Sequence, residues 1–124
     1  MQPGASTRTV NRGDIFWVAP DEARGAIPAI AHPYVIVQDD VFNHSRIATV
    51  VACALSTNVG RASEPGVVLL EEGEGGLPRR SVVLASQVSS VHRHELGAYL
   101  GTLSGSRVDE VVAALRFLQA SFHR

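Results

Sequence analysis

Short runs of apolar residues, separated by glycine, proline and polar residues, limit the folds open to this chain more than any other feature. Their length and their β-branched side chains are typical of strands. They predict strands at residues 14–18, 34–38, 48–55, 67–70 and 81–84, with a further short strand near residues 88–91. Short strands in close succession favour a small, mostly antiparallel barrel. Polar residues end several runs, and we expect them to gather at one rim of it.

The last part of the sequence predicts the clearest helix. Ser106 and Asp109, three positions apart, approximate a capping box at its start. Apolar residues then recur at helical spacing, namely Val108, Val111, Val112, Leu115, Leu118 and Phe122. Because the opposite side of this stripe is not basic, we expect the stripe to face a core or a partner protein rather than a membrane.

The segments between the predicted strands are expected to be irregular. Residues 19–32 carry two prolines and several alanines and predict a long surface loop, a kind of loop that is usually functional or mobile. A turn is predicted at residues 39–45, and a solvated loop at the acidic, glycine-rich residues 71–76. A helical turn is predicted at residues 93–96.

The length of 124 residues suggests a single domain, at residues 11–124 after a flexible leader of residues 1–10. A hydrophobic content of 45% with 19% charged residues excludes a disordered chain. The single cysteine, Cys53, excludes an internal disulfide and a cysteine-based zinc site, and its apolar surroundings predict a buried side chain. No stretch resembles a signal peptide or the roughly 20 apolar residues of a membrane span, so we expect a cytoplasmic protein without a membrane partner.

The formal net charge of −1 is not the electrostatic footprint of a strong nucleic-acid binder. Any contact with nucleic acid would have to use a local patch, and it would be weak and sensitive to salt. His92 and His94 have no aspartates or cysteines around them that suggest a metal site, so we predict no metal.

Several polar blocks border the predicted strands in a fixed order. They are Arg12–Gly13–Asp14 before an aromatic strand, Pro33–Asp40 with Asn43 beyond it, Leu55–Asn58, Gly76–Leu84, Ser86–Val88 and Gly101–Ser104. No single block is specific, but their order resembles that of the MazF/PemK family of toxin endoribonucleases. The resemblance covers roughly residues 11–120.

This resemblance implies a small SH3-like antiparallel barrel with a C-terminal helix, which forms a homodimer and is inhibited by a cognate antitoxin. It also implies sequence-specific cleavage of single-stranded RNA, without a metal or other cofactor, to 2′,3′-cyclic phosphate and 5′-hydroxyl ends. Family members usually carry a catalytic arginine directly before the proline of the second strand, where this chain has His32. The catalytic threonine of the family corresponds to Ser56, with Thr57 adjacent.

Metal-free RNA cleavage requires a base for the 2′-hydroxyl proton, an acid for the leaving 5′-oxygen and donors for the charged phosphorane. The imidazole of His32 suits either proton-transfer role. Ser56, ranked first by family position, and Thr57 are the candidates to hydrogen-bond a phosphate oxygen. Arg24, in the long loop, is the candidate to stabilise the transition-state charge. The plainer alternatives are a locally bonded histidine, a strand-end turn and a surface arginine.

Four further residues are candidates for binding RNA. Arg79 and Arg80 follow a proline and would track the RNA backbone, unless they are simply a solvated pair. Asn58 would read a base edge or shape a turn. Trp17 would offer a stacking surface, and because neighbouring residues of a strand point to opposite faces, one of Phe16 and Trp17 is expected to face the core.

Two other functions remain open for a chain of this kind. The CcdB toxins share the implied barrel, but they poison DNA gyrase and cut no RNA, so the fold alone does not separate the two activities. A barrel that binds RNA or an antitoxin without cutting is the third possibility. The replacement of the usual arginine by His32 keeps both alternatives open.

Overall fold

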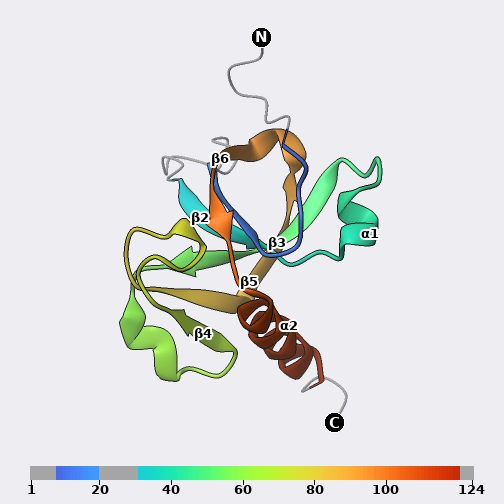
Figure 1. The fold of residues 1–124 in the computed structure, drawn as a ribbon. Helices are drawn as coiled ribbons and strands as arrows, with labels where there is room; N and C mark the ends of the chain where they lie inside the picture. The colour runs from blue at the N-terminus through green and yellow to red at the C-terminus, as the bar shows by residue number, and fades with distance from the viewer. Residues whose placement is uncertain (1–7, 20–30, 121–124) are drawn as a thin grey trace, which may run out of the picture.

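A six-stranded antiparallel sheet and a C-terminal helix make up the fold (Figure 1). The computed structural model describes residues 8–19 and 31–120. In chain order the elements are β1 (Asp14–Val18), β2 (His32–Ile36), α1 (Asp40–Asn43), β3 (Thr49–Ser56), η1 (Val59–Ser63), β4 (Val67–Leu70), η2 (Glu74–Gly76), β5 (Ser81–His92), η3 (Arg93–Glu95), β6 (Leu96–Thr102) and α2 (Gly105–Ala120).

The strands lie in the order β4-β5-β3-β2-β1-β6 across the sheet, and each neighbouring pair is antiparallel. This confirms the predicted mostly β fold with a C-terminal helix. Within the described part of the chain no ladder joins β4 to β6, so the two edges of the sheet do not close into the expected barrel.

The core lies on both faces of the sheet because alternate residues of a strand point to opposite sides. On one face, Ile15 and Cys53 belong to a cluster that Val111 of α2 helps to cover. On the other face, Phe16 and Ile36 belong to a second buried cluster. Burial of Cys53 was predicted, and it raises the pKa of the thiol to about 12. The reactive thiolate is therefore absent at neutral pH.

β5 is one long strand, whereas the sequence predicted two short ones. Its pairing with β3 is irregular: Cys53 lies opposite Val88, but Leu55 lies opposite Val83. A bulge of this kind leaves residues of one strand without a partner. It therefore interrupts the alternation of apolar and polar residues from which the strand was predicted.

β6 was not predicted at all, because its glycines lower the strand propensity of the segment. A side chain at Gly101 would place its Cβ 2.6 Å from the backbone of Gly75, and one at Gly97 would lie 2.9 Å from the carbonyl oxygen of Trp17. The two positions thus need glycine for the close approach of neighbouring backbone. The same residues that permit this packing obscure the strand in the sequence.

β2 begins two residues earlier than predicted, so His32 belongs to a strand and not to the preceding loop. Since β2 and β3 are antiparallel, the end of one lies beside the start of the other. Ser56 therefore shares a rim with His32, while Gln38 and Asn43 follow β2 at the opposite rim. The expectation that the polar ends of the runs gather at one rim is wrong for the run that ends at Gln38.

The opposite rim holds a closed set of hydrogen bonds. The short helix α1 lies where a turn was predicted, and Asn43 at its end is buried. The Asn43 amide donates to the carbonyl oxygen of Gln38 (2.8 Å) and to Asp40 (2.9 Å), and it accepts from the Gln38 amide (3.0 Å). Arg93 donates to the carbonyl oxygen of Asn43 (2.8 Å). These polar groups are hydrogen-bonded to one another, and their bonds hold α1 on the sheet.

The start of α2 differs from the predicted capping box. The helix begins at Gly105, and the Oγ of Ser104 accepts from the backbone N–H of Arg107 (3.3 Å). The carbonyl oxygen of Ser104 accepts from Val108 (2.9 Å). Ser104 therefore caps the helix in place of Ser106.

The predicted apolar stripe of α2 does face the core. Val111 is buried, and Val108 and Leu115 pack against the same cluster. Phe122, the last residue of the predicted stripe, lies outside the described residues. Of the helices that the structure describes, none is long and apolar enough to cross a membrane.

The acidic residues 71–76 are more than a solvated loop. They contain η2, and both carboxylate oxygens of Glu74 accept from Arg107, at 2.9 Å each. This paired contact joins η2 to α2. The hydrogen bond from Arg107 is also the main reason that the pKa of Glu74 is lowered.

Replacing Glu74 by glutamine tests this contact. The pKa of Glu74 is lower in the folded chain than the ordinary glutamate value of 4.5, so its carboxylate stabilises the fold above that pH and loses this effect as the pH falls through the folded pKa. We expect Glu74→Gln to lower the free energy of unfolding by about 1 kcal/mol at pH 7 and by less at pH 3. Urea unfolding at both pH values measures this. Glu72→Gln, at an exposed neighbour, is the matched control, and an equal loss at both pH values would contradict the assignment.

Candidate functional site

A cavity of about 300 Å³ opens at the rim where β1 and β3 end and where β2 and β5 begin. Its walls combine apolar residues with one imidazole, several hydroxyls and one guanidinium. The lining residues are Trp17, Ala31, His32, Pro33, Leu55, Ser56, Thr57, Leu77, Pro78, Arg79 and Ser81. Five of the eight predicted site residues are among them.

The register of the strands explains why His32 and Ser56 both lie at this rim. β2 and β3 pair Tyr34 with Ala54 and Val35 with Cys53, and the same register continued to the rim sets His32 opposite Ser56. Directly opposite residues of an antiparallel pair point to the same face, with Cβ atoms about 4.5–5.5 Å apart. His32 and Ser56 are therefore expected on the same face of the sheet, and both residues line the cavity.

The two candidate hydroxyls differ in their surroundings. The Oγ of Ser56 accepts a hydrogen bond from the backbone N–H of Asn58 (3.0 Å). This contact fixes the oxygen and leaves the hydroxyl proton available for a ligand. Thr57 is exposed and lines the cavity as well. Asn58 lies just before η1 and is not part of the cavity wall.

The adjacent arginines lie in different places. Arg79 lines the cavity, whereas Arg80 forms an ion pair with Glu71, at 3.0 Å from Nε to the carboxylate. Arg24, the candidate for transition-state charge, lies outside the described residues. Of the two predicted arginines that the structure describes, Arg79 lines the cavity and Arg80 does not.

The two aromatic residues of β1 point to opposite faces, as predicted. Phe16 is fully buried and packs against Tyr99, with ring centroids 5.6 Å apart. Trp17 is half-buried and lines the cavity. A base that enters the cavity would find the indole as a stacking surface.

Leu77 and Ser81 are among the residues of the cavity wall that sequence reasoning did not single out. Leu77 is almost fully buried and gives the cavity an apolar wall. Ser81 is 3% exposed, and its Oγ donates to the carbonyl oxygen of Arg79 (2.9 Å). Its position as the first residue of a strand after Pro–Arg–Arg was the available signal.

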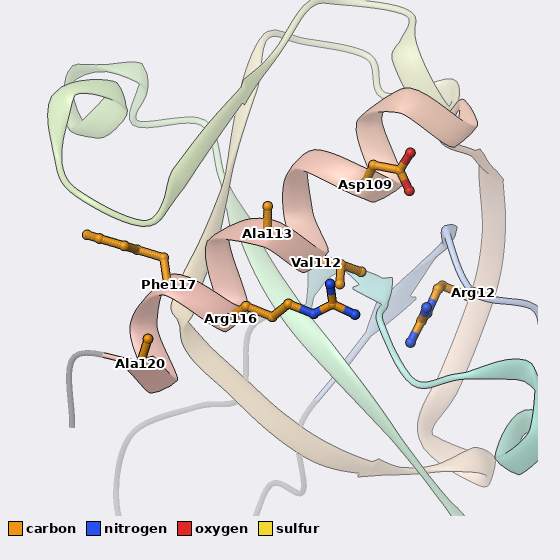
Figure 2. Close-up of a pocket in the computed structure, with 7 residues that line it drawn as sticks. All are labelled: Arg12, Asp109, Val112, Ala113, Arg116, Phe117 and Ala120. Atoms are coloured by element: carbon orange, nitrogen blue, oxygen red, sulfur yellow. The ribbon is translucent and has the colours of Figure 1, made fainter. Parts of the chain in front are cut away.

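A larger hollow lies along the outer side of α2 (Figure 2). It measures about 560 Å³ and is lined by Arg12 together with Asp109, Val112, Ala113, Arg116, Phe117 and Ala120. It lacks the histidine and the hydroxyl residues that line the smaller cavity. We therefore place the candidate active site in the smaller cavity. No three His, Cys, Asp or Glu residues of the described part group together in a way that could hold a metal ion.

Comparison with known proteins identifies relatives along nearly the whole chain. The family described as PemK-like, MazF-like toxin of type II toxin-antitoxin system matches residues 11–118. Endoribonuclease MazF6 of Mycobacterium tuberculosis is 33% identical over 107 residues, which cover 86% of this chain and 94% of that protein. Endoribonuclease MazF of Staphylococcus epidermidis is 29% identical over 106 residues, covering 86% and 88%.

Solved structures give the same relationship. An endoribonuclease in complex with its cognate antitoxin from a mycobacterial species superposes with a TM-score of 0.71 at 26% identity, covering 90% of this chain and 95% of that one. MazE–MazF from Deinococcus radiodurans, at 19% identity, shares the fold with a TM-score of 0.75 over 91% and 97% of the two chains. The resemblance found in the sequence is confirmed, and the chain belongs to the family of PemK-like and MazF-like toxins of type II toxin–antitoxin systems.

Proposed function

We propose that this chain is the toxin of a type II toxin–antitoxin pair and an endoribonuclease that cuts single-stranded RNA in the rim cavity. One observation carries the assignment to this cavity: His32, Ser56, Thr57 and Arg79 all line it. The register of β2 with β3, continued to the rim, sets His32 opposite Ser56. The near full-length similarity to MazF endoribonucleases supports the reaction class.

The reaction uses these groups without a metal or other cofactor. The 2′-oxygen attacks phosphorus as its proton leaves, the bond from phosphorus to the 5′-oxygen breaks, and that oxygen takes up a proton. His32 transfers a proton at one end of this linkage. Ser56 and Thr57 donate hydrogen bonds to the phosphorane oxygens, and Arg24, which precedes β2 in the sequence, adds positive charge. The products are a 2′,3′-cyclic phosphate and a 5′-hydroxyl.

Four residues bind the RNA in this proposal. Trp17 stacks on a base and Arg79 contacts a phosphate at the cavity. Arg80 and Asn58 each follow a residue that lines the cavity. In this proposal they contact the RNA nucleotides next to the one bound in the cavity. The small number of cations suits a protein with a net charge of −1, whose RNA binding is weak and sensitive to salt.

The partners follow the family. We infer a homodimer and a cognate antitoxin, supported by a relative solved with its antitoxin. The exposed Phe117 on the outer side of α2 favours that helix as part of the dimer contact. We also infer that residues 11–124 form one domain with the strand arrangement of an SH3-like barrel, and that the toxin acts in the cytoplasm on mRNA.

Cleavage in the presence of EDTA tests the proposed reaction. Antitoxin-free protein is incubated with a defined single-stranded RNA, and the ends are mapped. We expect cyclic phosphate and 5′-hydroxyl ends. His32→Ala should lower the rate by about 10²–10⁴-fold because a proton-transfer group is lost, and Ser56→Ala by about 10–10³-fold because a donor to the phosphorane is lost.

The matched control is Ser45→Ala, since the Ser45 hydroxyl also bonds to a backbone carbonyl (Phe42, 2.6 Å) but lies beyond α1 at the opposite rim. It should cut at the rate of the unaltered protein. Absence of cleavage, or cleavage that needs an added metal ion, would contradict the proposal.

The pH dependence of cleavage tests the role of His32 separately. Imidazole is the side chain whose charge changes between about pH 5 and 8, whereas a guanidinium stays charged over that range. We expect the initial rate of the unaltered protein to change across this range, and His32→Arg to give a flatter and broader profile. Identical profiles for the two proteins would show that His32 transfers no proton in the reaction.

The dimer contact is tested by size-exclusion chromatography at micromolar concentration. We expect the chain to elute at twice the mass of one copy. Phe117→Asp should raise the dimer dissociation constant about tenfold or more, because it removes an aromatic side chain that the proposed dimer would bury. Val41→Asp, at another exposed apolar position, should have less effect. Elution of the unaltered protein as one copy would contradict the dimer.

A further inference from the structure

The segment from Leu77 to Ser81 is anchored at both ends. Leu77 is 2% exposed and belongs to the core cluster next to α2, and Ser81 is 3% exposed and pairs with Leu70 of β4. Between these anchors only Pro78, Arg79 and Arg80 are exposed. A bend this short between two buried residues has little freedom to reorient.

Neighbouring residues in this bend have different environments. The Nε of Arg80 donates to Glu71, at the end of β4, at 3.0 Å. Arg79 instead lines the cavity with His32 and Ser56. In the described part of the chain its guanidinium has no ion-pair or hydrogen-bond partner. Two arginines that look equivalent in the sequence are therefore separated by the structure into one engaged and one available cation.

The side chain of Ser81 holds the backbone of the bend through a hydrogen bond. Its buried Oγ donates to the carbonyl oxygen of Arg79 at 2.9 Å, which ties the backbone of Arg79 to the start of β5. β5 pairs Val82 with Ser56, and the same register sets Ser81 opposite Thr57. The Ser81 hydroxyl thus links the arginine backbone to the strand ends that carry the candidate hydroxyls.

We propose that Ser81 is a positioning residue, which holds the backbone of Arg79 so that this guanidinium, and not that of Arg80, meets an RNA phosphate at the cavity. The inference rests on the proposed function, because it names the phosphate contact of the same site. Ser81 itself touches no reacting atom, and its hydroxyl proton is already used by the carbonyl oxygen.

Salt dependence of binding separates this role from a merely structural one. The probe is a fluorescein-labelled 2′-O-methyl oligoribonucleotide of mixed sequence, which lacks the 2′-hydroxyl and cannot be cut. Fluorescence anisotropy gives its dissociation constant at several salt concentrations. Arg79→Ala should weaken binding about tenfold and reduce the slope of log K against log salt by about 0.7, the value for one phosphate contact with a single strand.

Ser81→Ala should weaken binding about three- to tenfold and reduce the same slope. In an Arg79→Ala background it should change affinity by less than about twofold, since the two residues act through one contact. Ser81→Thr, which keeps the hydroxyl, should restore binding and slope. Arg80→Ala should cost less affinity than Arg79→Ala. Ser45→Ala, with an equivalent hydroxyl-to-carbonyl bond far from the cavity, should leave both quantities unchanged.

The inference is overturned if Ser81→Ala binds the probe with unaltered affinity and slope, or if its effect adds fully to that of Arg79→Ala. Thermal melting confirms that each variant is folded. If Ser81→Ala does not fold, Ser81→Cys, with a similar size and a weaker donor, is measured by the same criteria. If the unaltered protein binds the probe and cuts RNA but the Ser81 variants do not behave as expected, only this inference is wrong. If the unaltered protein neither binds the probe nor cuts RNA, the proposed function is wrong as well.

Discussion

The pairing of β2 with both of its neighbours is the constraint on which the rest of the structure depends. Val35 lies opposite Ile15 on one side and opposite Cys53 on the other, and all three are buried in the same cluster. A slip of one residue would turn Val35 out of the core and move His32 to the other face. Core packing therefore fixes the register, and the register, continued to the rim, sets His32 opposite Ser56.

The remaining wall of the cavity depends on a close approach of backbones. η2 packs against β6, where a side chain at Gly76 would collide with the carbonyl oxygen of Leu100 and one at Gly101 would collide with Gly75. Gly76 also has a φ of +74°, which favours glycine. The chain then passes through Leu77 in the core into the bend that carries Arg79. Contacts that look purely structural thus decide where the cation of the site lies.

In the proposed site, different residues hold the phosphate in place and supply the positive charge. The Ser56 hydroxyl is held by a backbone contact with Asn58, so in the proposed reaction it would meet a phosphate without large rearrangement. The charge comes from few cations, which is consistent with a chain of net charge −1. A histidine takes the place where family members usually carry arginine. The proposed reaction is therefore tied to pH in a way that a permanently charged side chain would not be.

Local patterns were enough to predict β1 and β4, the C-terminal helix, the burial of Cys53 and the opposite orientations of Phe16 and Trp17, because each follows from alternation or helical spacing within a few residues. They were not enough for β6, whose glycines serve contacts with distant backbone, or for the bulge in β5. The sequence by itself determined which residue types are available for the chemistry and, by the order of its motifs, the family. Only the tertiary structure decided that His32 and Ser56 share a rim while Gln38 lies at the other, and that Arg79 rather than Arg80 faces the cavity. Strand direction and ion pairing depend on residues far apart in the chain, and no local pattern records them.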